Sequence, residues 1–225
     1  MSDEARASTA HDSDTSDLDT PVGSIRRLAL AWSVFGLIAL YASFQLTVDR
    51  IRLLQNPDVV LFCDISPFVS CGPVMESHPG MVFGFPNPII GLVAFTVMVT
   101  SGMAVLAGAR FKPWYWIGLQ LGLTFAGVFI TWLQAQSMWN IGALCLWCMV
   151  VWATTIPMAV LTTSYALANG QWFSEQRGVS WGRRFGRWMH DYRWTLIALW
   201  YLAIIAAITA TFYREFAFMW FGAVL

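Results

Sequence analysis

The chain has 225 residues, of which 57% are apolar and only 12% are charged, with 13 basic residues against 13 acidic ones. So few charges cannot cover the surface of a water-soluble domain without large exposed apolar patches, so the composition excludes an ordinary soluble protein and predicts one that lies in a bilayer. The formal net charge of zero provides no general attraction for nucleic acid, and no nucleic-acid partner is expected.

Residues 1–23 are rich in acidic and small residues, and Arg6 is the only basic residue among them. A cleavable signal peptide begins with basic residues, so this acidic start does not match one. We predict that residues 1–23 form a disordered cytoplasmic tail.

Five apolar segments follow, each near the roughly 20 residues that a membrane-spanning helix needs. The predicted spans are residues 28–48, 87–107, 114–133, 141–167 and 194–212. A proline-rich outer loop at residues 49–86 separates the first two spans, and a polar interruption at residues 134–140 separates the third from the fourth. Residues 169–193 interleave arginine with tryptophan, which predicts a basic cytoplasmic loop at the membrane interface.

The basic residues predict the orientation of these spans, because lysine and arginine accumulate on the cytoplasmic side. With a cytoplasmic N-terminus, ten of the 13 basic residues fall inside the cell. The ten are Arg6, Arg26, Arg27, Arg110, Lys112, Arg177, Arg183, Arg184, Arg187 and Arg193. Five spans then place the C-terminus outside, and they place all four cysteines at the outer, oxidising face.

Cys145 and Cys148 form a Cys-x-x-Cys pair at the start of an apolar segment. Their spacing of three places both sulfurs on one face of a helix, close enough to bridge. Free backbone N–H groups at a helix start favour the thiolate form that disulfide exchange needs. The alternative is two apolar packing cysteines in a membrane helix.

Cys63 and Cys71 form a second pair, separated by seven residues of the outer loop. This pair could be a structural disulfide, or the loop could bring it to the helix pair for exchange at high effective concentration. Metal binding by the four thiols is the weaker hypothesis, because they lie outside and only His78, which we interpret as a surface residue, is near in the sequence. No metal is therefore expected.

The order of motifs along the chain resembles the vitamin K epoxide reductase family over roughly residues 28–168. The resemblance rests on the loop cysteine pair, Ser77 six residues after Cys71, the segment from Phe83 to Asn87, Gly91 and the later Cys-x-x-Cys. It implies an all-α integral membrane fold, with a four-helix transmembrane bundle around a quinone in residues 24–168 and a fifth, peripheral transmembrane helix in residues 194–225.

The resemblance also implies roles for individual residues. Cys63 and Cys71 are the shuttle pair and Cys145 and Cys148 face the quinone, so that Cys71 meets Cys145 while Cys63 serves the partner and Cys148 the quinone. Ser77 supports the active site and Asn87 lies near a quinone carbonyl. Further residues expected in the quinone pocket are Phe83, Phe85, Trp147 and Trp152, the last at a position where the family often has tyrosine.

The function implied is that of a quinone-dependent thiol oxidoreductase in the bacterial inner membrane. It would reoxidise an exported DsbA-like thioredoxin-fold protein and pass the electrons to a quinone, with menaquinone expected. Many bacterial members carry a fused thioredoxin-like domain after the fifth helix, and the printed chain stops at Leu225, so a separate partner is expected.

Two alternatives stay open from the sequence. A DsbB-type oxidase performs the same net reaction, but there the Cys-x-x-Cys pair precedes the loop pair, the reverse of the order in this chain. A non-catalytic membrane protein with two structural disulfides would show the same scarcity of charge. Titration of free thiols before and after addition of a quinol separates this last case, because structural disulfides would not respond.

Overall fold

The computed structural model describes residues 21–66, 69–172 and 180–213. Within these residues the chain is helical, with only isolated β-bridges. The long helices are α2 (Ile25–Gln55), α4 (Pro88–Leu106), α5 (Pro113–Gln136), α6 (Leu146–Ala168) and α8 (Arg193–Thr211). The shorter ones are α3 (Gly72–Glu76), the 3-10 turn η1 (His78–Met81), the π-helical turn η2 (Ser137–Ile141) and α7 (Ser180–Asp191).

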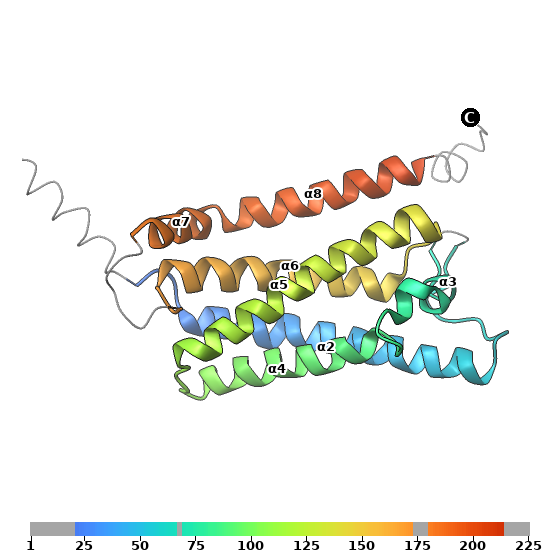
Figure 1. Cartoon of the computed structure of the whole chain (residues 1–225), viewed down its shortest axis with the longest axis horizontal. Coiled ribbons are helices and arrows are strands. Elements are labelled where there is room, and N and C mark those ends of the chain that lie inside the picture. Colours follow the sequence, from blue (N-terminus) through green and yellow to red (C-terminus); the bar gives the residue numbers. More distant parts are fainter. Residues whose placement is uncertain (1–20, 67–68, 173–179, 214–225) are drawn as a thin grey trace, which may run out of the picture.

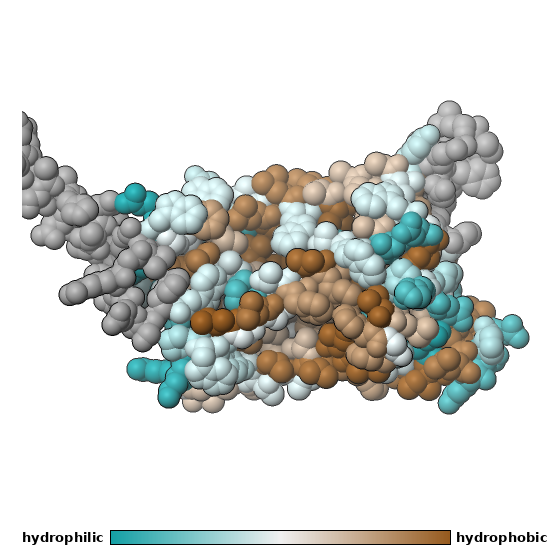
Figure 2. All heavy atoms as spheres, in the orientation of Figure 1, coloured by the Kyte–Doolittle hydropathy of each residue, from teal (hydrophilic) through white to brown (hydrophobic). Residues whose placement is uncertain are grey.

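The five long helices run along one another as a bundle (Figure 1). By length and composition each could cross a bilayer, with η2 extending the third. On the face shown in Figure 2, hydrophilic residues gather near the two ends, and mostly apolar residues lie between them. These observations confirm the predicted all-α, multi-pass membrane fold.

Helices α2 and α4 pack closely because small residues meet along their interface. A Cβ atom on Gly91 would collide with the Ser43 hydroxyl, and one on Gly102 would come within 2.7 Å of the Ala29 carbonyl oxygen. Because glycine has no side chain, the two backbones can approach closely. Membrane helices gain van der Waals contact in this way without a hydrophobic driving force. Helix α4 therefore lies against α2 along its length, whereas the consecutive helices α4 and α5 barely touch.

Polar contacts join helix α6 to α2 and to α8. The Trp32 indole N–H of α2 donates a hydrogen bond to Thr162 Oγ1 at 2.7 Å, and both side chains are fully buried. On the other side, Pro157 has no N–H to give to the Ala153 carbonyl. The Tyr201 hydroxyl of α8 donates to that freed carbonyl instead. The backbone hydrogen bond that α6 lacks at Pro157 thus leaves an acceptor to which α8 attaches.

Helix α8 is otherwise peripheral. Ile197 is its only buried residue among those described, and side chains such as Leu199, Leu202 and Ile205 are more than half exposed. The predicted fifth, peripheral span is confirmed. Residues 214–225, which complete the predicted C-terminal segment, lie outside the described residues.

Helix α2 extends seven residues beyond the expected end of the first span. Asp49 and Arg50 continue the helix as buried residues instead of beginning the loop. The Arg52 guanidinium contacts the Asp49 carboxylate at 3.4 Å, and Arg50 lies 4.0 Å from Glu76. Leu53 then packs against the cysteine loop. Charge pairing and this apolar contact hold the extra turns, and the outer loop starts after Gln55.

The predicted break between the third and fourth spans also lies later than expected. Helix α5 continues through Gln136, and the next five residues form η2. Gly142 then adopts a left-handed conformation with φ of 70° and ends the helical segment. Helix α6 begins only at Leu146, so Cys145 precedes the helix with an extended backbone and Cys148 lies in its first turn.

At the end of the bundle opposite the cysteines, the Asn169 side chain links the end of α6 to the segment that precedes α2. The Asn169 side chain accepts a hydrogen bond from the Val22 N–H at 2.9 Å and donates one to the Val22 carbonyl at 3.0 Å. Helix α7 packs on the same end of α6, where Gly186 lies directly against Leu167 and Ala168.

Residues 1–20 of the predicted tail lie outside the described residues.

Candidate functional site

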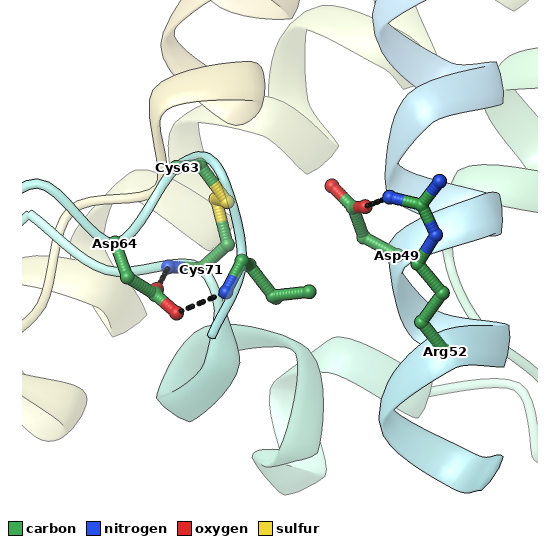
Figure 3. Close-up of polar contacts among 6 residues, drawn as sticks. Asp49, Arg52, Cys63, Asp64 and Cys71 are labelled. Atoms are coloured by element: carbon green, nitrogen blue, oxygen red, sulfur yellow. Dashed lines mark hydrogen bonds and ion pairs between the residues drawn. A yellow bond between two sulfur atoms is a disulfide. The ribbon is translucent and has the colours of Figure 1, made fainter. Parts of the chain in front are cut away.

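The outer loop is organised around one carboxylate, that of Asp64. Its oxygens accept hydrogen bonds from the Ser70 hydroxyl at 2.6 Å and from the Leu61 N–H at 3.1 Å. They also accept one from the Cys71 N–H at 3.0 Å (Figure 3). Partial burial alone would raise the pKa of Asp64, but these hydrogen bonds, together with one from the Gly72 N–H, outweigh it and lower the pKa. The ionised form therefore holds both ends of the loop together.

The loop is also joined to the segment that precedes α6. The Ser70 N–H donates to the Leu144 carbonyl at 3.0 Å, and Val69 forms a parallel β-bridge with Leu144. The Ser137 hydroxyl donates to the Ala143 carbonyl and fixes the other side of that segment. Because Leu144 and Cys145 are adjacent, as are Ser70 and Cys71, this pairing brings the two cysteine pairs together.

Three sulfur atoms consequently lie next to one another at one end of the bundle, in the spatial order Cys63, Cys71 and Cys145. Cys63 and Cys71 form a disulfide, and Cys145 Sγ lies 3.3 Å from Cys71 Sγ. All three residues are fully buried, and Leu46, Leu53, Leu61 and Met75 surround them. Cys145 and Cys148 are free thiols, and Cys148 is only partly buried. A thiolate at either Cys71 or Cys145 is within reach of the other sulfur, which is the contact that disulfide exchange requires.

A cavity of about 480 Å³ begins beside this sulfur array and lies between α2, α4, α5 and α6. Cys148, Trp152 and Thr155 of α6 line one wall. Most of the remaining wall is apolar, with Phe95, Met98, Leu123 and Phe129 among its residues. The cavity occupies the space that α4 and α5 leave between them. An apolar cavity with a few polar groups is typical of a site for a small apolar ligand.

Asn87 and Ser77 both line this cavity. The Asn87 Nδ2 group donates a hydrogen bond to the Pro79 carbonyl at 2.7 Å, and its Oδ1 is buried without a partner among the described residues. Asn87 immediately precedes α4, yet its side chain makes no capping hydrogen bond to that helix. The Ser77 hydroxyl donates to the Val74 carbonyl at 2.7 Å, so it holds α3 in place beside the cavity.

The predicted aromatic residues are placed differently from one another. Trp152 is buried and lines the cavity. Phe83 and Phe85 stack on each other, and Phe83 reaches Phe129, a lining residue, but both are at least 40% exposed and lie outside the lining. Trp147 also lies outside the lining and packs edge-on against Tyr41, with ring centroids 5.7 Å apart.

Two residues of this region are not among those expected from the sequence. Asp64 follows Cys63 directly, and Ser70 precedes Cys71. Aspartate and serine are typical of turns, because their side chains hydrogen-bond to nearby backbone groups. Thr155 lies seven residues after Cys148, so helical periodicity alone places it on the same face.

Among the described residues, no group of three or more histidine, cysteine or acidic side chains is placed to hold a metal ion.

Replacing Asp64 with alanine is expected to open the loop. The variant loses hydrogen bonds from four donors to a charged acceptor, so the oxidised protein should lose roughly 1–3 kcal/mol of stability at neutral pH. A small dithiol should therefore reduce the Cys63–Cys71 disulfide faster. The folded-state pKa is lowered, so this stabilisation is present above the ordinary aspartate pKa and is lost as the pH falls through the lowered value.

The matched control for this prediction is Asp58→Ala, since Asp58 is an exposed acidic residue of the same loop. Stopped-flow reduction and urea unfolding at several pH values provide the two measurements. Equal reduction rates in Asp64→Ala and Asp58→Ala would refute the organising role of Asp64.

Comparison with known proteins agrees with this geometry. The sequence model of the family described as "Vitamin K epoxide reductase family" matches residues 30–163, which is more than half of the chain. A search of curated proteins found no match. The matched segment runs from α2 through α6 and includes the sulfur array and the cavity, and the chain belongs to the vitamin K epoxide reductase family.

Proposed function

We propose that the protein oxidises the dithiol of an exported thioredoxin-fold partner and passes the electrons, through its two cysteine pairs in series, to a membrane quinone. Membership of the family makes it a quinone-linked thiol oxidoreductase. The observation that carries the finer proposal is the 3.3 Å contact between Cys71 and Cys145, with Cys148 at the wall of the cavity.

The first exchange takes place at the loop disulfide. A thiolate of the partner attacks Cys63 Sγ, the Cys63–Cys71 bond breaks, and Cys71 leaves as a thiolate. The partner's second thiol then attacks the mixed disulfide, which releases Cys63 and leaves the partner oxidised. Because Cys63 is fully buried, the loop must shift before a protein thiol can reach it.

The second exchange transfers the electron pair to the helix pair. With Cys145 and Cys148 joined as a disulfide, the Cys71 thiolate attacks Cys145 Sγ and Cys148 leaves. Cys63 then attacks Cys71 Sγ, restores the loop disulfide and releases Cys145. The result is one loop disulfide and two helix thiols, which is the state that the structure shows.

The cavity beside Cys148 fits a quinone ring. Its walls are mainly apolar, as the ring requires, and the buried Thr155 hydroxyl, which has no partner among the described residues, can donate to a ring carbonyl. A bound quinone supplies the oxidant for the helix pair, so that Cys145 and Cys148 end as a disulfide while two electrons and two protons leave on the quinol. The resemblance to bacterial family members supports menaquinone as the natural species.

The test is thiol titration of the purified protein. As isolated it should contain two free thiols, and addition of a quinone should reduce that number to zero. Addition of a reduced thioredoxin-fold donor should then sustain continuous quinone reduction. A protein with structural disulfides would keep its thiol count, and that result would eliminate the proposed function. A DsbB-type enzyme shares the net reaction, but the family match supports the present assignment over it.

An exposed apolar surface around Cys63 fits the partner. The side chains of Val60, Phe62 and Ile65 are 83%, 82% and 66% exposed, and they flank the buried disulfide. Large exposed apolar patches mark protein–protein contacts. Replacing both Phe62 and Ile65 with serine should lower kcat/KM for a thioredoxin-fold donor about tenfold. Activity with a small dithiol, which needs no docking, should change less than twofold. Equal losses with both donors would contradict partner docking.

We also propose that the cysteine end of the bundle faces the outside of a bacterial inner membrane. The described basic residues Arg26, Arg27, Arg110 and Lys112 adjoin helix ends away from the cysteines, and positive charge accumulates on the cytoplasmic side. A periplasm-dependent reporter fused after Leu225 should therefore be active, and the same reporter placed before Met1 should be silent. Activity only at the N-terminal fusion would reverse this orientation.

A further inference from the structure

Two side-chain oxygens stand out among the described residues. Asn87 Oδ1 and Thr155 Oγ1 are the only oxygens there that are buried without a hydrogen-bond partner. Both residues line the same cavity. An unpaired hydroxyl in an apolar interior costs about 1–3 kcal/mol, so its persistence calls for a partner that binds in the cavity.

The free hydroxyl of Thr155 is unusual for its helix. The hydroxyls of Thr154, Thr162, Thr163 and Ser164 each donate to a carbonyl one turn earlier in α6. This back-bonding is the ordinary solution for serine and threonine in an apolar helix. Thr155 is fully buried, yet it makes no such bond. Its hydroxyl is therefore not used by its own helix, and Thr155 is one of the residues that line the cavity.

Its position on α6 relates Thr155 to the reacting thiol. Cys148, Trp152 and Thr155 recur at intervals of four and three residues, so they form one stripe on the helix face that borders the cavity. Thr155 lies about 10 Å beyond Cys148 along the helix axis. The Cα–Cβ bonds of a helix tilt toward its N-terminus, so the Thr155 side chain leaves the helix toward the end that carries Cys148. A single quinone ring with a hydrogen bond at its far side fills this interval.

We propose that Thr155 is a quinone-binding residue, whose hydroxyl donates a hydrogen bond to a carbonyl oxygen of the bound ring. This inference rests on the proposed function and adds a specificity element to it. The Thr155 hydroxyl stays unpaired with a purely hydrocarbon ligand, so the cavity selects a ring with an acceptor at that depth. The remaining N–H of Asn87, whose other N–H serves Pro79, is available to a second carbonyl oxygen.

The test compares three variants of the full-length protein. Thr155→Val keeps the shape and removes the hydroxyl, whereas Thr155→Ser keeps the hydroxyl. Thr154→Val is the matched control, because the Thr154 hydroxyl bonds carbonyls of its own helix and Thr154 is outside the cavity lining. Menadione binding is measured by quenching of tryptophan fluorescence, and the carbonyl stretch of carbon-13-labelled menadione is recorded by infrared difference spectroscopy.

Thr155→Val should weaken menadione binding about 3- to 10-fold, as expected for one lost hydrogen bond. One carbonyl band should shift to higher frequency, KM should rise with little change in kcat, and Thr155→Ser should restore both binding and the band. Thr154→Val should behave as wild type. If Thr155→Val does not fold, Thr155→Ala against Thr155→Ser provides the same comparison.

Wild-type affinity together with an unshifted carbonyl band in the hydroxyl-free variant would overturn the role of Thr155. Failure of the proposed function is a different result. In that case the wild-type protein itself would bind no menadione, and its two free thiols would not respond to the quinone.

Discussion

Replacing Cys148 with serine is expected to abolish the full dithiol-to-quinone reaction and to trap a disulfide between Cys71 and Cys145. In this variant Cys145 has lost the thiol with which it would form the helix disulfide. Its sulfur lies 3.3 Å from Cys71 Sγ, so attack on the loop disulfide releases Cys63 and leaves the new bridge in place. Peptide mapping under non-reducing conditions identifies the joined cysteines.

Cys63→Ser approaches the same intermediate from the other side. Cys71 then has no loop partner, and its attack on the oxidised helix pair should also accumulate the Cys71–Cys145 bridge. The reaction with a protein donor should be lost, because the residue proposed to receive it is gone. A small dithiol should still reduce the helix pair directly, so part of the quinone reduction should survive with that donor.

These two variants decide between series and parallel transfer. A trapped bridge that joins any other pair of cysteines, or full activity in Cys148→Ser, would refute the series scheme. Leu54→Ser is the control for the introduction of a serine hydroxyl near the cysteine end of α2. Leu54 is exposed, and its replacement leaves all four sulfurs in place.

Asn87→Ala is expected to lower kcat/KM for quinone about tenfold, because the variant loses the side-chain hydrogen bond to the ring. The Asn87 Nδ2 group donates to the Pro79 carbonyl at 2.7 Å, and its second N–H can donate to a ring carbonyl, because Asn87 lines the cavity. Because the side chain makes no capping bond to α4, the melting temperature should fall by only a few degrees.

Asn56→Ala is a suitable control for Asn87→Ala, because Asn56 is an exposed amide in the outer loop, away from the cavity. Turnover per folded molecule and the melting temperature are measured for both variants. A large fall in the melting temperature of Asn87→Ala with unchanged turnover per folded molecule would show that the amide serves folding and not the quinone.

The membrane-spanning helices can be predicted from the sequence because hydropathy is a local property. Runs of roughly 20 apolar residues identify the spans without any knowledge of their neighbours. Helix ends are less predictable, and α2 shows why. Asp49 and Arg50 are typical of the start of a loop, but Arg52 and Glu76 pair with them in the fold and keep them helical. The partner Glu76 is distant in the sequence, so local patterns do not indicate it.

The cysteine chemistry divides in the same way. The spacing of Cys145 and Cys148, the loop pair and the order of the two pairs are properties of the sequence, and they are enough to indicate the family. Of the pocket residues expected from the sequence, Asn87 and Trp152 line the cavity, whereas Phe83, Phe85 and Trp147 lie outside its lining. Ser77, which was expected to support the active site, also lines the cavity. Aromatic residues are common throughout the spans, so residue type alone cannot distinguish a pocket wall from a lipid-facing or packing position.

By itself the sequence determined that this is a five-span membrane protein with two cysteine pairs, because apolar runs and cysteine spacing are short-range patterns. The family resemblance implied that Cys71 meets Cys145, but only the tertiary structure shows how the two sulfurs come together. Cys71 and Cys145 are 74 residues apart, and the hydrogen bond between Ser70 and Leu144 brings them into contact. Tertiary structure likewise leaves Thr155 without an acceptor while its neighbours are satisfied, because a buried hydroxyl acquires a role only from the space that other helices leave around it.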